Sequence, residues 1–280
     1  MPMSMTTSTT TATATAMTMT KTMASPLNIL MLHGKTQSGQ LFYAKTRALE
    51  KHLVKACAPT RLAFHYPTAP HRLYLRDIPD VDPALLQSDE ESDGMYTWWR
   101  KDETTGEYKG INETWKFISE YLDKNGPFIG AIGFSQGAGL AAILASILEP
   151  SRPKPQSIIT DGFTTTHPPL KFAVAYCGFK APNEEYKWMY EPKIQTPVLN
   201  VLGSLDTVVD EKLMKGLVDV CEGQRVLWHP GGHYVVVKKQ WLDAVGVFVR
   251  DSINETGTSK AAAAKEEEEE ESVEDMEMPF

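Results

Sequence analysis

The motif GFSQG at residues 133–137 is the part of the sequence whose residue types and spacing most directly suggest chemistry. A serine between two glycines can be a nucleophile when it stands on a tight turn from a strand into a helix. The apolar run PFIGAIGF precedes Ser135 and the run AGLAAILASIL follows it. Glycines suit this turn because larger side chains would collide there. The motif therefore predicts a nucleophile at Ser135, with an unreactive turn as the alternative.

A serine hydroxyl needs a base to take its proton, and in this arrangement the acid and then the histidine follow the serine along the chain. His233 lies in the glycine loop HPGGHYV after the last predicted strand, where it can reach back over the edge of the sheet. His167 lies in a Thr/Pro-rich loop and His229 at the end of a strand, where packing or capping is expected. We predict that His233 is the base.

Two aspartates, Asp206 and Asp210, follow the predicted strand PVLNVLG. Asp206 lies in the turn just beyond the strand, whereas Asp210 directly precedes a helical run and is placed to cap that helix. We therefore predict that Asp206 orients the imidazole of His233 and stabilises its protonated form without taking the proton.

Backbone N–H groups must stabilise the charge that develops on the attacked carbonyl oxygen. One donor is expected from Gln136, directly after the serine, and the other from the loop after the first strand, which reads LHGKTQSG. We predict that the oxyanion hole consists of the N–H groups of Lys35 and Gln136. His33, in the same loop, is expected to shape it through hydrogen bonds.

Strand-like apolar runs alternate with helical patterns along the middle of the chain. We predict strands at 27–34, 61–66, 127–134, 172–179, 197–203 and 225–230, and helices at 41–56, 112–126, 138–148, 211–221 and 238–253. The strands are continuous apolar runs, which are typical of a sheet covered on both faces. The pattern predicts an α/β fold with a mostly parallel, doubly wound sheet.

The stretch 70–110 interrupts this alternation. It is rich in Pro, Asp, Glu and Gly, yet it contains several aromatic residues. Two interpretations stay open: a lid or pocket wall over the site, or a surface excursion whose aromatic side chains pack into the core. If the stretch covers the site, Tyr96, Trp98 and Trp99 are expected to contact an apolar acyl chain of the substrate.

The charges are concentrated at the C-terminal end. The formal net charge of the 280 residues is −8; residues 251–280 carry −9 and residues 1–25 carry +1, so residues 26–250 are neutral. A neutral body has no basic surface for nucleic acid, and we expect no nucleic-acid partner.

Both ends of the chain have biased composition. Residues 1–25 are almost entirely Thr, Met, Ala and Ser, and residues 254–280 run into AAAAKEEEEEE. Neither end has a periodic apolar face, so we predict a disordered leader and a disordered acidic tail around a folded domain at 26–253. A targeting leader and an acidic docking tail are the alternatives.

Cysteine content and hydropathy exclude other classes of protein. Cys57, Cys177 and Cys221 are too few and too scattered for a disulfide framework or a zinc site, and Cys177 lies in an apolar run typical of a core. No apolar run reaches the length of a membrane-spanning helix. We therefore expect a cytoplasmic protein with no metal, no cofactor and no membrane span.

Several blocks of the sequence together resemble the FSH-type serine hydrolases. These blocks are LMLHGKTQSG, WWR followed by TTGEYKGINETW, PFIGAIGFSQGAGLAAILA, FAVAYCGF, PVLNVLGSLDTVVD and HPGGHYV, and they span about residues 27–250. The resemblance implies the α/β-hydrolase fold over the domain at 26–253. It also implies a triad of Ser135, Asp206 and His233, the residues already reached from their spacing.

The resemblance implies an esterase or thioesterase, since the family includes enzymes that accompany fungal polyketide synthases and release an acyl chain from a carrier. We expect hydrolysis of a small-molecule ester or acyl thioester through an acyl-enzyme on Ser135, with a carrier-bound substrate in fungal polyketide metabolism as a sub-hypothesis. Two alternatives stay open. One is an acyltransferase with the same triad, and the other is a non-catalytic binding module with the acidic tail as its docking segment.

Overall fold

A six-stranded parallel sheet forms the centre of the computed structural model, which describes residues 25–77 and 94–254. The strand order is β10-β9-β8-β7-β1-β2. The strands are β1 (Leu27–Leu32), β2 (Leu62–His65), β7 (Phe128–Phe134), β8 (Phe172–Tyr176), β9 (Val198–Gly203) and β10 (Arg225–His229). All lie within the predicted runs. Of the predicted leader (1–25) and tail (254–280), residues 1–24 and 255–280 lie outside the described residues.

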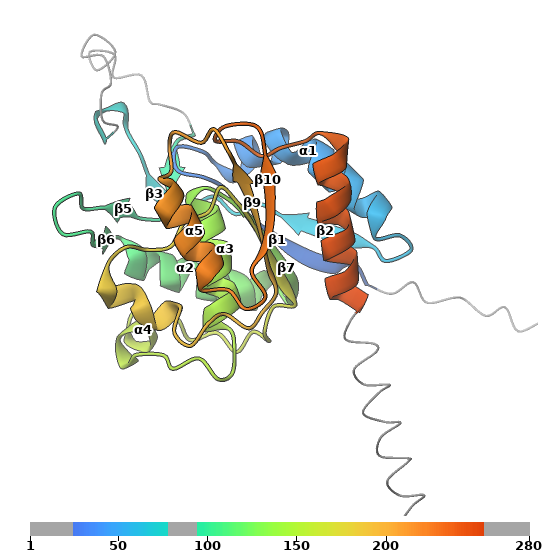
Figure 1. The fold of residues 1–280 in the computed structure, drawn as a ribbon. Helices are drawn as coiled ribbons and strands as arrows, with labels where there is room; N and C mark the ends of the chain where they lie inside the picture. Colours follow the sequence, from blue (N-terminus) through green and yellow to red (C-terminus); the bar gives the residue numbers. More distant parts are fainter. Residues whose placement is uncertain (1–24, 78–93, 255–280) are drawn as a thin grey trace, which may run out of the picture.

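Helices cover both faces of this sheet (Figure 1). Helix α1 (Gly39–Ala56) and the helix of residues 239–254 lie on one face. The other face carries α2 (Ile111–Asn125), α3 (Gln136–Ile147), α4 (Gln156–Thr160), η3 (Glu184–Met189) and α5 (Glu211–Asp219). The predicted α/β architecture, mostly parallel and doubly wound, is confirmed. Within 25–77 and 94–254, no helix has both the length and the apolar character needed to cross a bilayer.

Strand β1 shows how the sheet builds two cores. Leu30 and Leu32 are buried in the core that contains α2 and α3, whereas Ile29 and Met31 are buried in the core that contains α1 and the C-terminal helix. Successive side chains of a strand point to opposite faces, so a run that is apolar at every position must be covered on both sides. This is why the strands are continuous apolar runs.

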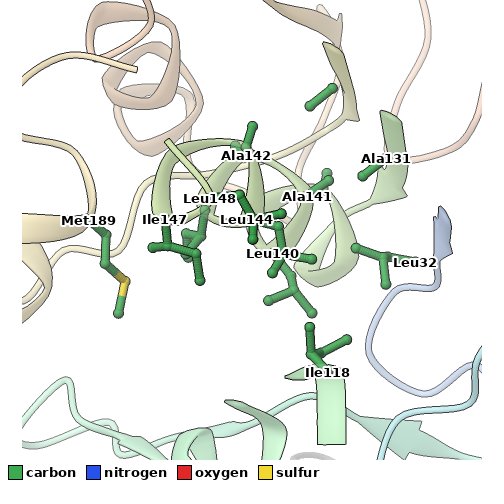
Figure 2. Close-up of a cluster of buried hydrophobic side chains, with 14 of the residues drawn as sticks. Leu32, Ile118, Ala131, Leu140, Ala141, Ala142, Leu144, Ile147, Leu148 and Met189 are labelled. Carbon is green, nitrogen blue, oxygen red and sulfur yellow. The ribbon is translucent and has the colours of Figure 1, made fainter. Parts of the chain in front are cut away.

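Helix α3 is buried along its whole length. Figure 2 shows Leu140, Leu144 and Ile147 of this helix grouped with Ile118 of α2 and Met189 of η3. Its many alanines and glycines let the backbone lie close to the sheet. The start of the helix, immediately after Ser135, is therefore held rigidly in place.

The stretch 70–110 contains short regular elements where it is described. Strand β3 (His71–Arg72) pairs with β4 (Tyr96–Thr97), and β5 (Arg100–Lys101) pairs with β6 (Tyr108–Lys109), both antiparallel. A 3-10 turn, η1 (Leu75–Asp77), follows β3, and β5 with β6 projects from one side of the molecule (Figure 1). Trp98, Trp99 and Tyr108 are buried, as expected if the aromatic side chains pack into the core.

Gly137 marks a close contact between α3 and β1. A Cβ atom at this position would lie 2.2 Å from the carbonyl oxygen of Leu32 and 2.5 Å from that of His33. These are backbone atoms of the neighbouring strand and loop, so they cannot move aside without shifting β1. A glycine is required here because the backbones touch.

We expect Gly137→Ala to lower the free energy of unfolding by about 1–3 kcal/mol, the usual cost of overpacking. Gly216→Ala in α5 is the matched control, because its nearest side-chain atom, Lys180 Cβ, is 3.7 Å from the added Cβ. That control should raise the free energy of unfolding by up to about 1 kcal/mol, since alanine favours helix. Urea unfolding of both variants checks this; equal effects would contradict the close contact.

Candidate active site

Ser135 stands at the tip of the turn between β7 and α3. Its φ of 53° and ψ of −117° lie in a region that residues with a side chain rarely adopt. The Ser135 carbonyl accepts hydrogen bonds from the N–H groups of Ala138 and Gly139, which begin the helix. A Cβ on Gly133 would lie 2.1 Å from the Gly137 carbonyl oxygen. The two glycines therefore allow the close strand-to-helix packing that this strained turn requires.

Asp206 and His233 are brought together from two neighbouring strand ends. Asp206 follows β9 and His233 follows β10, and Asp206 Oδ2 accepts a hydrogen bond from His233 Nδ1 over 2.7 Å. The side chain of Asp206 is fully buried, and that of His233 is 14% exposed. The hydrogen bond fixes the histidine tautomer, so the other ring nitrogen, Nε2, is left to accept a proton.

The pKa of the Asp206 carboxyl is lowered although its burial acts to raise it. The N–H groups of Val209 and Val208 donate to Asp206 Oδ1 at 3.0 and 2.9 Å, and together with the His233 ring they outweigh the cost of burial. Asp206 is therefore held as a carboxylate. Asp210, by contrast, accepts a hydrogen bond from the Lys212 N–H and caps α5, as predicted.

Ser135 and His233 line the same cavity, whose volume is about 820 Å³. The Ser135 hydroxyl makes no hydrogen bond to any described residue, and nucleophile–base contacts are often loose before substrate binds. The cavity is lined by apolar and aromatic residues together with polar and charged ones, which include Lys45, Lys101 and Glu103. The apolar and aromatic lining residues are Phe42, Trp99, Tyr108, Phe134, Phe179, Val208, Val209, Tyr234, Val235 and Val237.

The predicted oxyanion-hole residues, Lys35 and Gln136, also line this cavity. Among the described residues, neither backbone N–H donates a hydrogen bond, whereas the neighbouring N–H of Thr36 donates to the Tyr96 carbonyl over 2.9 Å. Gln136 is the first residue of α3, where N–H groups lack helical partners and the helix dipole favours negative charge. Two free donors therefore border the cavity beside Ser135.

The side chain of Gln136 is held by the segment that follows β4. Its Oε1 accepts hydrogen bonds from the Trp98 N–H and the Thr97 hydroxyl, both at 2.8 Å, and its Nε2 donates to the Trp99 carbonyl at 2.9 Å. All four groups are buried. The sequence gives no signal for this contact, because Gln136 and Trp98 are 38 residues apart.

The three predicted substrate-contacting aromatics occupy different places. Trp99 lines the cavity, but Tyr96 and Trp98 are not among its lining residues. Trp98 is fully buried, and its Nε1 donates to the His33 carbonyl over 2.9 Å. The Tyr96 backbone forms a bridge with Gln37 in the loop after β1. The Tyr96 backbone and the Trp98 ring thus hold the loop after β1, and contact of their side chains with an acyl chain stays a prediction of the sequence.

His33 shapes the same loop, and both of its ring nitrogens are engaged. Its Nε2 accepts a hydrogen bond from the Ala69 N–H at 3.0 Å, so the proton is on Nδ1, which donates to the Gly34 carbonyl at 2.8 Å. Burial lowers the pKa of His33 to about 4, against a smaller raising effect of the Gly34 carbonyl. His33 is therefore neutral and has no nitrogen free to act as a base.

The two rejected downstream histidines occupy structural positions. His167 Nε2 accepts a hydrogen bond from the Phe128 N–H at 2.7 Å, which holds the entry into β7. His229 is buried at the end of β10 against the rings of Tyr234 and Trp241. Neither residue lines the cavity that contains Ser135.

A buried thiol lies next to the Asp206–His233 pair. Ligand-type atoms of Cys177, Asp206 and His233 all lie within 4.8 Å of one another. Burial, with the nearby Asp206 carboxylate, raises the pKa of the Cys177 thiol to about 12, so it is a thiol and not the thiolate that binds metals. The chemistry of this group fits a hydrogen-bonded acid–histidine pair better than a metal site.

Known proteins resemble this chain in sequence and in fold. The sequence matches the model of a family described as serine hydrolase (FSH1) over residues 21–245. It is 35% identical over 229 residues to Family of serine hydrolases 2 of Saccharomyces cerevisiae, and the match covers 77% of this chain and 97% of the yeast protein. It is 31% identical over 229 residues to Esterase OVCA2 of Danio rerio, and the match covers 76% of this chain and 91% of that esterase.

Two further similarities bear on length and fold. A Schizosaccharomyces pombe protein named dihydrofolate reductase is 36% identical over 217 residues, and the match covers 76% of this chain and 44% of that protein. The chain thus spans less than half of that relative. The crystal structure of Arabidopsis thaliana SOBER1 superposes with a TM-score of 0.53 at 16% identity, covering 82% of this chain and all of that one. This likeness concerns the fold alone.

The buried, neutral His33 predicts a pH dependence of stability. Its folded pKa of about 4 is below the ordinary value of 6.5, so as pH falls through this window the unfolded chain takes up the proton first. Stability that is present above pH 6.5 is therefore lost as pH falls toward 4. The full shift corresponds to roughly 3 kcal/mol in the free energy of unfolding.

His33→Gln isolates this contribution from other titrating groups. The variant should be less stable than the wild type at pH 7, and the difference between them should shrink as pH falls from 6.5 to 4. Urea unfolding at four or five pH values in this window measures the difference. A constant difference would mean that His33 is not held neutral by the fold.

Proposed function

Because the chain belongs to the serine hydrolase (FSH1) family, we propose that it hydrolyses carboxylic esters or thioesters through an acyl-enzyme on Ser135. The 2.7 Å hydrogen bond between Asp206 and His233, beside the cavity that Ser135 lines, is the observation that carries this function. The strained backbone of Ser135 and the two free N–H groups support the same reaction.

The first step forms the acyl-enzyme. His233 Nε2 takes the proton of Ser135 Oγ as Oγ attacks the substrate carbonyl, and Asp206 stabilises the imidazolium through Nδ1. The N–H groups of Lys35 and Gln136 donate hydrogen bonds to the resulting oxyanion. The tetrahedral intermediate then expels the alcohol or thiol, which leaves with the proton from His233.

The second step returns the enzyme to its starting state. His233 takes a proton from a water molecule, whose oxygen attacks the acyl-enzyme carbonyl, and the same two N–H groups hold the second oxyanion. When this intermediate collapses, Ser135 Oγ leaves and regains a proton from His233. The net reaction adds one water molecule to the ester or thioester and yields a free acid.

The walls of the cavity favour an apolar acyl group or alcohol. Trp99, Phe134 and Phe179 line it, with valines contributed by the loops after β9 and β10. The substrate is accordingly a small-molecule ester or acyl thioester. A carrier-bound substrate, a role in fungal polyketide metabolism and a cytoplasmic location stay predictions of the sequence.

An acyltransferase is the second candidate, because the same acyl-enzyme can react with an alcohol or amine. Adding such a nucleophile to the assay would divert product from the free acid to a new ester or amide. The third candidate, a binding module, places its docking segment in the acidic tail, which lies outside the described residues. Reaction of Ser135 with a fluorophosphonate would count against that role.

We expect Ser135→Ala to abolish turnover of p-nitrophenyl esters and labelling by a fluorophosphonate. Asp206→Asn should lower kcat by at least about 10³-fold, because the histidine loses its orienting carboxylate. Asp210→Asn is the matched control, since Asp210 lies four residues away but caps α5. It should keep kcat within about twofold of the wild type. Equal losses in the two aspartate variants would contradict the assignment of Asp206.

The different positions of Trp98 and Trp99 predict different effects on substrate chain length. Trp99→Ala should lower kcat/KM for octanoate and longer esters more than for acetate, because it removes part of the cavity wall. Trp98→Phe should lower kcat/KM by the same factor, about tenfold, for all chain lengths, because it frees the His33 carbonyl that positions the oxyanion loop. Assays from acetate to palmitate distinguish the two; matching profiles would contradict the separate roles.

A further inference from the structure

The loops after β9 and β10, which carry the catalytic acid and histidine, expose large apolar side chains to solvent. Leu205 and Val208 in the first loop are 68% and 69% exposed, the two highest fractions of any large apolar residue described. Tyr234 and Val237 in the second loop are 48% and 46% exposed. Single exposed apolar side chains are normal on a protein surface, whereas a group of them in one place marks a site of interaction.

These two loops meet at the mouth of the cavity that contains the catalytic serine. Val208, Tyr234 and Val237 all line this cavity, and the Leu205 N–H donates to the Gly231 carbonyl over 2.9 Å, so the loops are in direct contact. Because the three lining side chains are also exposed to solvent, they form the outer edge of the cavity and not its floor. We call Leu205, Val208, Tyr234 and Val237 the apolar rim.

Other exposed residues at this mouth are cationic. Lys35 in the loop after β1, Lys45 in α1 and Lys101 in β5 are exposed and line the same cavity. Lys101 pairs with Glu103 over 2.9 Å, and Glu103 is the one acidic residue among the described residues that line the cavity. Lys35 and Lys45 form no ion pair with any described residue. The mouth therefore carries a net positive charge, although residues 26–250 as a whole are neutral.

A lipid surface with anionic headgroups fits both features of the mouth. Exposed apolar side chains enter the boundary between headgroups and acyl chains, while lysines are attracted to the anionic headgroups. Behind the mouth the cavity is lined by Trp99, Phe134 and Phe179, so it suits an apolar chain, which partitions into membranes and not into water. A mouth that touches the lipid surface lets such a chain enter the cavity without passing through water.

We propose that the cavity mouth docks on an anionic lipid surface, with the apolar rim in the lipid and Lys35, Lys45 and Lys101 against the headgroups. The inference rests on the proposed function, because it explains how an ester held in a membrane reaches Ser135. Docking is reversible, since four side chains bury far less apolar area than a membrane-spanning helix. It needs no rearrangement of the fold, because the rim is already exposed.

The first test is sedimentation of Ser135→Ala protein with lipid vesicles, which needs no catalysis. One set of vesicles is phosphatidylcholine alone, and the other contains about 30% phosphatidylserine. We expect binding to the second set to be at least about tenfold tighter and to weaken as salt is raised, because salt screens the lysines. Equal binding to both sets overturns the proposal. No binding to either set, the result expected if an acidic protein occupies this face, overturns it too.

Substitutions in the same protein separate the apolar and the cationic contributions. Leu205→Gln should weaken binding to the anionic vesicles by about fivefold, because a large apolar side chain no longer enters the lipid. Lys45→Gln should weaken it by about fivefold, the usual effect of one lysine near an anionic surface. The matched controls are Ile159→Gln in α4, where Ile159 is 41% exposed, and Lys51→Gln in α1, since neither residue lines the cavity. If the controls weaken binding as much, the mouth is not the docking surface.

Hydrolysis then tests whether docking delivers the substrate. With p-nitrophenyl palmitate presented in the anionic vesicles, Leu205→Gln alone should lower kcat/KM by about fivefold, but with soluble p-nitrophenyl acetate it should stay within about twofold of the wild type. A merely structural effect would lower both rates by the same factor, and that result overturns the proposal. If Ser135→Ala hydrolyses the acetate ester as fast as the wild type, the proposed function is wrong, and vesicle binding alone decides this inference.

Discussion

Ser135 keeps its unfavourable backbone conformation because β7, α3 and β1 are packed tightly around it. Its φ of 53° would relax if the helix could move, but α3 is buried along its whole length and Gly137 lies against the backbone of β1. The strain is therefore carried by the hydrophobic packing on both faces of the sheet. The same packing directs Oγ and the Gln136 N–H toward one cavity.

A buried polar network connects this turn to the loop after β1. Residues 97–99 form hydrogen bonds with both the oxygen and the nitrogen of the Gln136 carboxamide. The indole N–H of Trp98 also donates a hydrogen bond to the His33 carbonyl. Because every one of these groups is buried, breaking one contact leaves a polar atom unpaired. The network thus fixes the distance between two backbone donors that belong to separate loops. Thr97 and Trp98, which do not line the cavity, thus help to position groups that do.

The acid–histidine pair is built differently, at the carboxyl ends of β9 and β10. Asp206 and His233 come from the loops after β9 and β10, and the Asp206 carboxylate is held by two backbone N–H groups of its own turn. Local hydrogen bonds hold the Asp206 carboxylate, and the His233 ring also packs against the ring of Phe134. The substrate cavity lies between the rigid turn at Ser135 and these two loops, with Trp99 and Tyr108 as a third wall.

The sequence alone predicted the order of strands and helices along the chain, the serine turn, the capping role of Asp210 and the role of His33 in shaping its loop, because each depends on apolar runs or on neighbours a few residues away. Tertiary structure decided which aromatic residues face the cavity. Trp98 and Trp99 are adjacent in sequence, yet one donates to His33, 65 residues away, and the other lines the cavity. The hydrogen-bond partners of Gln136 could not be predicted from the sequence either, since a local pattern carries no information about which distant groups meet in a packed core.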